Sequence, residues 1–223
     1  ASTTDPLTGL RNRRYLYEQI GKDVDLVLRH YRDGTETMKP GGNNDLLFLM
    51  VDLDNFKPVN DNCGHEAGDE LLCQIRDVLL EACRFSDDVI RWGGDEFLIV
   101  ARETNRKYAA TLAERVRSSL AQRVFPVGNG QVARTSASIG YASYPFIQEQ
   151  PELLQWEEVL GVADAAMYEA KRKRNAWIGI EGIDWDGTSD ELYSAVKLNP
   201  GKLAAEGLIR AVESIDDAEQ SVG

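Results

Sequence analysis

Residues 88–101 read DVIRWGGDEFLIVA, two apolar runs separated by a pair of glycines. Glycine reaches positive φ without steric cost, so a Gly-Gly pair between β-branched and aromatic residues predicts a β-hairpin. A hairpin requires two antiparallel strands in one sheet, which limits the fold classes open to this chain. It does not explain Asp95 and Glu96, since Asp is a poor strand former and a buried unpaired charge is costly.

The rest of the chain alternates between helical and strand-like patterns. Leu46–Asp54, LLFLMVDLD, is a continuous apolar run typical of a buried central strand. Further strands are expected at 131–145 and 176–181, an exposed loop at 32–45, and helices at 5–31, 56–84, 105–122 and 156–175. Helices that alternate with strands around a hairpin predict an α+β fold with one mainly antiparallel sheet flanked by helices.

Length and charge divide the chain into two parts. With 223 residues it can form one sizeable domain, expected at 1–182, and an extension at 183–223 with short helices near 189–198 and 201–213. The extension holds 9 Asp and Glu against 3 Lys and Arg, half of the net charge of −12. This acidity argues against a nucleic-acid partner and means that an anionic ligand needs local cations or metal ions.

No apolar run is long enough to cross a bilayer, and the chain opens on Ala1 without a signal-like leader. We therefore expect a fragment or processed chain from which an N-terminal sensory or regulatory module, with or without a membrane anchor, is missing. The three cysteines are odd in number and lack CxxC pairing, which indicates reduced thiols and a cytoplasmic location.

Acidic residues lie at the ends of two predicted strands, Asp52 and Asp54 at one and Asp95 and Glu96 at the other. Residues i and i+2 share a strand face, so Asp52 and Asp54 are expected to point the same way. Oxygen ligands without His or Cys suit Mg²⁺ or Mn²⁺, and two such ions can clamp an in-line attack at phosphorus. Alternatively these acids cap helices or pair with Arg91 and Lys57. We favour this second interpretation for Asp54 and the metal site for Asp52 and Asp95.

The sequence RWGGDEF resembles the namesake motif of the GGDEF family of diguanylate cyclases. Three further stretches resemble motifs of the same family, in family order between residue 5 and about 181: DPLTGLRNRR, VDLDNFKPVNDNCGHEAGDELL and ADAAMYEAKRKRN. The resemblance implies a palm-like sheet related to that of nucleotidyl cyclases. It also implies that GTP is the substrate, and that two protomers of a homodimer, each holding one GTP, form cyclic di-GMP and pyrophosphate.

The resemblance also implies a role for each matching residue. Asp52, Asp95 and the backbone carbonyl of Leu53 would coordinate Mg²⁺ or Mn²⁺, with Asp95 also the base for the attacking 3′-OH and Glu96 a further metal-site or supporting acid. Guanine would be read by Asn60 and Asp69, with His65 nearby, and phosphates would be met by Lys171, Arg91 and Lys57. Asp69 favours GTP because a carboxylate accepts the N1–H and N2–H₂ donors of guanine. His65 could instead be a polar helix-start residue, and Asp69 could act on the helix dipole.

Arg84–Asp87, RFSD, matches the family's RxxD inhibitory motif at nine residues before Gly93. Together with Arg115 it would bind the cyclic di-GMP product, because guanidinium groups bind phosphates and guanine edges bidentately. The alternative is a surface ion pair. The chain departs from the family at Ala170–Asn175, AKRKRN, which is one residue shorter than AKxxGRN and lacks its glycine, and at Cys63, where an aromatic residue is usual.

Three functions are candidates for this sequence. The first is an active diguanylate cyclase with feedback inhibition. The second is a catalytically inactive module that binds GTP or cyclic di-GMP, which the presence of all expected acids disfavours. The third, a polymerase-like enzyme or an adenylyl cyclase, conflicts with the guanine-reading pattern of Asn60 and Asp69.

Overall fold

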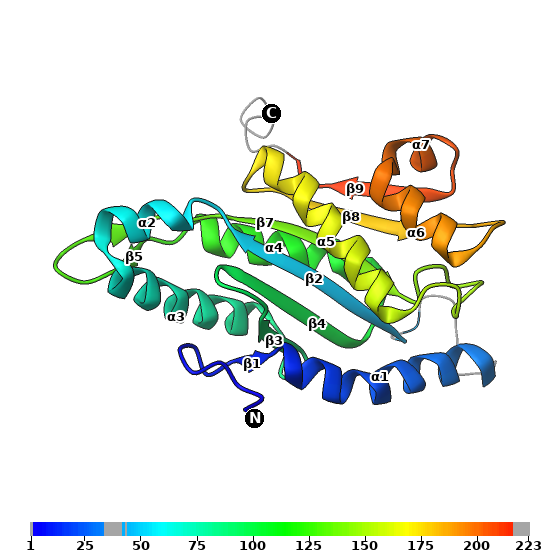
Figure 1. Cartoon of the computed structure of the whole chain (residues 1–223), viewed down its shortest axis with the longest axis horizontal. Coiled ribbons are helices and arrows are strands. Elements are labelled where there is room, and N and C mark those ends of the chain that lie inside the picture. Colours follow the sequence, from blue (N-terminus) through cyan, green and yellow to red (C-terminus); the bar gives the residue numbers. More distant parts are fainter. Residues whose placement is uncertain (1, 34–41, 43, 216–223) are drawn as a thin grey trace.

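The computed structural model describes residues 2–33, 42 and 44–215 and contains a seven-stranded, mainly antiparallel sheet (Figure 1). Its strand order is β1-β3-β4-β2-β7-β8-β9, with only β1–β3 and β7–β8 parallel. The strands are β1 (Arg11–Asn12), β2 (Asp45–Leu53), β3 (Asp88–Arg91), β4 (Glu96–Thr104), β7 (Ala137–Tyr144), β8 (Trp177–Gly182) and β9 (Ile209–Glu213). β5 (Phe125–Pro126) and β6 (Val132–Ala133) form a separate small hairpin. The predicted α+β fold with a mainly antiparallel sheet is confirmed.

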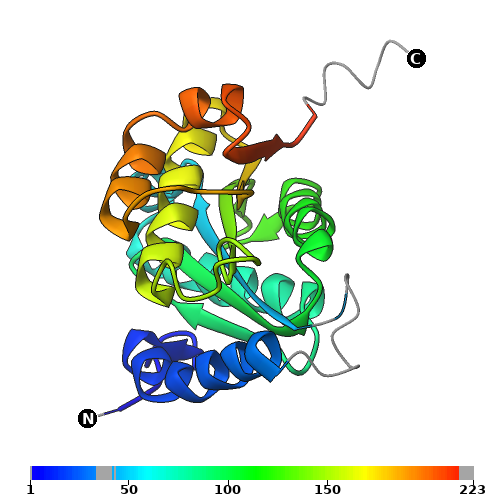
Figure 2. The same ribbon diagram turned by 90° about the vertical axis from the view of Figure 1, so that its right-hand side faces the viewer.

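Helices cover both faces of this sheet (Figure 2). One face carries α3 (His65–Ala82) and α4 (Ala109–Ala121), and the other carries α1 (Arg13–Asp33), α5 (Trp156–Lys173) and α6 (Ser189–Leu198). The short helices α2 (Phe56–Cys63), η1 (Arg106–Tyr108) and α7 (Pro200–Ala205) connect larger elements. β2 therefore lies at the centre of a three-layer structure.

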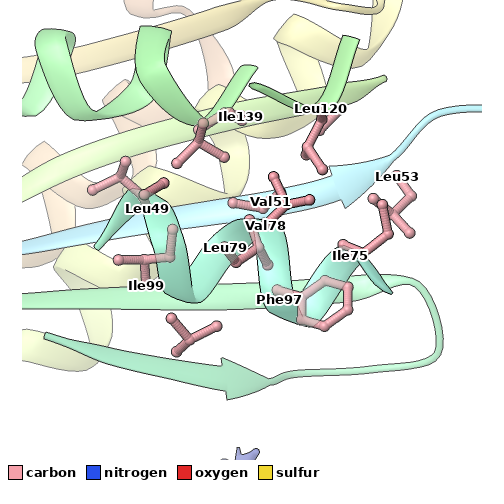
Figure 3. Close-up of a cluster of buried hydrophobic side chains, with 14 of the residues drawn as sticks. Leu49, Val51, Leu53, Ile75, Val78, Leu79, Phe97, Ile99, Leu120 and Ile139 are labelled. Carbon is pink, nitrogen blue, oxygen red and sulfur yellow. The ribbon is translucent and has the colours of Figure 1, made fainter. Parts of the chain in front are cut away.

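The burial of β2 follows from its central place. Successive side chains of a strand point to opposite faces, and here both faces are covered. Leu49, Val51 and Leu53 pack with α3 and α4, as Figure 3 shows, whereas Phe48 and Met50 pack with α1 and α5. This two-sided burial explains the continuous apolar run and leaves polar groups only where the strand ends.

The helical stretch expected at 56–84 is two helices that meet at Gly64, whose φ is 91°. A positive φ is accessible to glycine at no steric cost, so the chain changes direction there. Pro58 lies in the first turn of α2, where its missing N–H leaves no hydrogen bond unmade. The corner places the end of α2 against the start of α3.

The second helix expected in the extension, at 201–213, is wrong in its last part. α7 ends at Ala205, the chain turns at Gly207 with φ 76°, and β9 pairs antiparallel with β8. Backbone pairing with an open sheet edge decides the structure of this segment over its helical composition. α6 buries Leu192 and Val196 in the same core as α5, while the division at residue 182 stays a prediction.

Two predicted segments fall outside the described residues: most of the loop at 32–45 and the end of the chain beyond residue 215. Among the residues that are described, no helix is both long and apolar enough to cross a membrane.

Candidate active site at the ends of β2 and β4

The predicted acids meet at one end of the β2–β4 ladder. Asp52 stands opposite Glu96 in the antiparallel register, and the backbone N–H of Leu53 donates to the carbonyl of Asp95 at 3.0 Å. The chain enters β4 directly from the glycine turn, so Asp95 and Glu96 are brought to the end of β2. The structure thus gathers Asp52, Leu53, Asp95 and Glu96 at one edge.

The turn that carries Asp95 is held by backbone hydrogen bonds within it and by the side chain of Arg91. The backbone N–H groups of Trp92 and Gly93 donate to the carbonyl of Glu96 at 2.9 and 3.1 Å. A β-carbon at Gly93 would lie 2.8 Å from Oε2 of Glu96, so the glycine leaves room for that carboxylate. Arg91 donates to the carbonyls of Gly93, at 2.6 Å, and Gly94. In this structure Arg91 therefore supports the turn.

Lys171, in the last turn of α5, contacts the same end of β2. Its Nζ donates to the carbonyl oxygen of Leu53 at 2.8 Å and lies 3.1 Å from Oδ1 of Asp52 and 3.5 Å from Oδ1 of Asp54. Asp52 and Asp54 thus face the same cation, as their i and i+2 spacing predicts. One ammonium group is shared between two carboxylates and a carbonyl.

Burial and mutual repulsion perturb the acids of this edge. Burial raises the pKa of Asp52 against the opposing effect of Lys171, and the charges of Asp95 and Asp54 raise it further. Burial also raises the pKa of Glu96, followed by the charges of Asp52, Asp164 and Asp95. This concentration of negative charge favours a bound cation.

Asp164 is a member of this charge cluster that the sequence reasoning missed. It lies on α5, seven residues before Lys171, and residues spaced by seven share a helix face. That spacing is a signal in the sequence that could have identified it.

The donors present fit a hard divalent cation. Oδ1 of Asp52 is buried and faces the ammonium of Lys171 at 3.1 Å, so this carboxylate oxygen already lies against a positive charge. Within the described ranges, no three His, Cys, Asp or Glu side chains gather closely enough to hold a metal ion. The predicted ligand set of Asp52, Asp95 and the Leu53 carbonyl contains two side chains and a backbone oxygen, which are ligands that Mg²⁺ and Mn²⁺ accept.

The carboxylate of Asp54 connects three parts of the backbone, but its hydrogen-bond donors are not the predicted Arg91 and Lys57. Its fully buried carboxylate accepts hydrogen bonds from the hydroxyls of Ser136 at 2.6 Å and Ser138 at 2.8 Å, and from the backbone N–H of Asn175 at 2.8 Å. Neither Arg91 nor Lys57 is among these donors. Asp54 ties the end of β2 to the start of β7 and to the end of α5.

The predicted guanine readers lie around the corner between α2 and α3. A β-carbon at Gly68 would lie 1.8 Å from Oδ1 of Asn60, so the Asn60 amide lies directly over α3 at Gly68, the residue before Asp69. His65 begins α3, and both His65 and Asp69 are exposed. An exposed carboxylate can accept the donors of a guanine edge.

Two further cations lie at the start of α2. Lys57 is exposed in the first turn of α2. Arg174, just after α5, donates to Oδ1 of Asn55 at 3.0 Å and so links the end of α5 to the start of α2.

A second cluster brings together the predicted inhibitory residues. Asp87 is buried and accepts from the backbone N–H of Arg84 at 2.8 Å and from the Arg84 guanidinium at 3.2 Å. The guanidinium carbons of Arg84 and Arg115 lie 5.7 and 5.5 Å from the centre of the Tyr108 ring. Sequence reasoning missed Tyr108, which precedes Arg115 by seven residues on the same helical path. Two exposed guanidinium groups around an aromatic ring suit a planar anionic ligand.

Comparison with protein families matches residues 2–176 to the family described as diguanylate cyclase, GGDEF domain. The chain belongs to this GGDEF family. It is 35% identical over 169 residues to the diguanylate cyclases DosC of Escherichia coli K12 and DgcP of Pseudomonas aeruginosa. Each alignment covers 76% of this chain, 33% of DosC and 22% of DgcP, so the chain spans a third or less of these GGDEF proteins.

Solved GGDEF structures confirm the cyclase-like palm fold. Diguanylate cyclase SiaD of P. aeruginosa, in complex with its activator SiaC, is similar at a TM-score of 0.64 and 34% identity, covering 78% of this chain and 60% of that one. The coiled coil and GGDEF domain of DgcB from Caulobacter crescentus, in complex with c-di-GMP, has a TM-score of 0.63 and 25% identity, with 78% and 83% covered. GGDEF cyclases generally need a divalent metal.

Proposed function

We propose that this GGDEF domain condenses two molecules of GTP into cyclic di-GMP and two pyrophosphates. The observation that carries the proposal is the cluster at the ends of β2 and β4, where Asp52, the Leu53 carbonyl and Asp95 lie together beside Lys171. Similarity to named diguanylate cyclases supports it, although those proteins are longer than this chain.

Asp52, Asp95 and the Leu53 carbonyl would hold Mg²⁺ or Mn²⁺. When bound, the ion supplies positive charge that stabilises the attacked α-phosphate and the leaving pyrophosphate. The buried Oδ1 of Asp52 supports this assignment, because it already faces a positive charge, the ammonium of Lys171 at 3.1 Å.

Asp95 accepts the proton of the attacking 3′-OH. The bond from O3′ to the α-phosphorus forms, and the bond from that phosphorus to pyrophosphate breaks. Glu96, held beside the glycine turn, is the supporting acid. Lys171, Arg91 and Lys57 are the phosphate cations, Lys171 being the one already at the edge.

Asn60 and Asp69 select guanine, with His65 at the same corner. A carboxylate at residue 69 pairs with the N1–H and N2–H₂ donors of guanine, and adenine lacks this pattern. The domain should therefore use GTP and leave ATP unreacted.

One domain holds one GTP, so two copies must face each other to join two nucleotides in a ring. We propose a homodimer for catalysis, brought together by an N-terminal sensory or regulatory module outside this chain. The three free thiols fit the reducing cytoplasm, where the proposed partners are GTP and cyclic di-GMP and not nucleic acid.

Cyclic di-GMP would also bind at Arg84, Asp87 and Arg115 and inhibit the enzyme. The arrangement of Arg84 and Arg115 around Tyr108 supports this second site, since guanidinium groups can pair with phosphate while the ring stacks on a base. DgcB, a similar structure, was solved with c-di-GMP.

The test is incubation of the purified chain with GTP and Mg²⁺ at several protein concentrations, followed by nucleotide chromatography. Cyclic di-GMP should appear with a steeper than linear dependence on protein concentration, and Asp95→Asn should abolish it. Asp190→Asn, the same change at an exposed position of α6, should leave the rate unchanged. A chain that binds GTP or cyclic di-GMP without turnover at any concentration would instead be a nucleotide receptor.

A further inference from the structure

A buried arginine on α4, Arg117, hydrogen-bonds to the end of α5, the helix that carries Lys171. Arg117 is 6% exposed, and its guanidinium forks onto Glu114, with Nη2 to Oε1 at 2.7 Å and Nε to Oε2 at 3.0 Å. Its remaining nitrogen, Nη1, donates to Oδ1 of Asn175 at 2.9 Å. The indole N–H of Trp177 also donates to Glu114, at 2.8 Å.

Asn175 extends these contacts to the catalytic edge, by which we mean the end of β2 where Asp52, the Leu53 carbonyl and Asp95 lie. Its backbone N–H donates to Oδ2 of Asp54 at 2.8 Å, and Asp54 lies 3.5 Å from Nζ of Lys171. Arg117, Asn175 and Asp54 therefore form one continuous series of polar contacts. The series starts on the α4 face of the sheet and ends beside the cation that meets Asp52.

The backbone at the end of α5 requires such support. Arg174 and Asn175 are consecutive residues with positive φ, 59° and 44°, and neither is glycine. Such conformations cost free energy and persist where the surroundings determine them. Here Arg117 fixes the side chain of Asn175 and Asp54 fixes its N–H. Lys171 lies in the last helical turn before this bend, so the position of its ammonium depends on the bend.

We infer that Arg117 is a positioning residue for the catalytic edge: through Asn175 and Asp54 it fixes the end of α5 and holds Lys171 against Asp52 and the Leu53 carbonyl. Arg117 is 6% exposed, and the groups of this series that face it are Glu114 and Asn175. Its effect on turnover rests on the proposed cyclase function, whereas its effect on the cation-binding edge does not.

The first test compares Arg117→Met with Arg123→Met, the same change at an exposed arginine just beyond α4 whose ion pair is with Glu81. At a temperature where both variants are folded by circular dichroism, Arg117→Met should lower kcat by roughly tenfold to a hundredfold, as displacements of about 1 Å do. KM for GTP should change less than threefold, because the guanine readers lie on α2 and α3. Arg117→Lys, which keeps the charge but loses the planar fork onto Glu114, should fall between.

Asn175→Gly is the second variant, because it is the gentler change. Glycine accepts the positive φ, keeps the N–H bond to Asp54 and the backbone carbonyl 3.5 Å from Arg117, and removes the side-chain amide whose oxygen Arg117 binds. It should lower kcat in the same direction while the protein stays folded. This variant answers the question if Arg117→Met does not fold.

A readout without GTP separates this inference from the proposed function. Free Mn²⁺ measured by electron paramagnetic resonance should show an apparent Kd at least fivefold lower for Arg117→Met and Asn175→Gly than for Arg123→Met, because an ammonium that is no longer held against Asp52 and the Leu53 carbonyl competes less with the ion for these oxygens. Inactivity of the unmodified chain would overturn the cyclase function and leave this comparison intact. Mn²⁺ affinity and kcat equal to those of Arg123→Met in both folded variants would overturn the positioning role.

Discussion

Gly140, in β7, sets how closely α5 approaches the sheet, and we expect Gly140→Ala to destabilise the protein and slow turnover. A β-carbon at Gly140 would lie 2.0 Å from the backbone nitrogen of Met167 and 2.1 Å from the carbonyl oxygen of Ala163. Both are backbone atoms of α5, so no side chain can swing aside. Ordinary contact distances of about 3.5 Å require the helix and the strand to separate by roughly 1.5 Å.

Overpacking of this kind costs about 1 to 3 kcal/mol, and a contact with rigid backbone belongs at the upper end, about 3 kcal/mol. Lys171 follows Met167 by one helical turn and moves with it. A displacement of about 1 Å at a group that contacts substrate can lower the rate by roughly a hundredfold. Gly140→Ala should therefore lower both the free energy of unfolding and kcat.

Gly161→Ala, in α5, is the matched control. Its β-carbon would lie 2.1 Å from the hydroxyl of Tyr193, the end of a half-buried side chain that can move. Alanine in a helix gains about 1 kcal/mol over glycine, which offsets that shift. Urea unfolding and initial rates of cyclic di-GMP synthesis measure both variants. The reasoning is refuted if Gly140→Ala stays within 1 kcal/mol of the unmodified chain or loses less than Gly161→Ala.

Three further predictions concern other parts of the molecule. Burial, helped by Asp87, raises the pKa of the Cys83 thiol to about 12, so iodoacetamide at pH 8 should modify it far more slowly than Cys73 by peptide mass spectrometry; equal rates would contradict this. The hydrogen bond from Arg117 holds the pKa of Glu114 in the folded protein below its ordinary value of 4.5. The ionised Glu114 therefore stabilises the fold above pH 4.5, and this stabilisation is lost as the pH falls through the lower pKa of the folded state. Glu114→Gln should flatten the loss of unfolding free energy below pH 4.5 in urea titrations, and an unchanged slope would count against this assignment. Leu192→Ala in the fully buried face of α6 should cost about 2 to 5 kcal/mol and shift one shared unfolding transition; an unaffected main transition would show that the extension folds separately.

The fold class follows from the sequence wherever a single element carries its own signal. The central strand shows as an apolar run because both of its faces are covered, and the hairpin shows because only glycine fits its turn easily. β9 has no such signal: residues 209–213 form a strand because the edge of β8 is open to them. Pairing across the sheet is a property of the whole chain and cannot be seen within five residues.

The same limit applies to the candidate site. Asp52, Asp95 and Glu96 could be located from the sequence because strand ends and a glycine turn fix them within their own segments. The phosphate role of Lys171 stays a prediction, but its contacts with Asp52 and Leu53 could not be predicted, because the topology brings these residues to it from another element.

Arg117 has one partner that the sequence suggests and a second partner that only the structure reveals. Ala113, Arg117 and Leu120 follow the i, i+4, i+7 spacing of one buried helix face, so the sequence indicates a charged side chain directed into the core. A buried guanidinium must be paired, since an unpaired charge in the interior is too costly. The spacing of three suggests Glu114 as one partner. The second partner, Asn175, lies in another element and becomes visible only when α4 and the end of α5 are placed on the sheet. This second contact connects the helix to Asp54 and the proposed catalytic edge. It makes Arg117→Met a sharper test of positioning than any change at the edge itself.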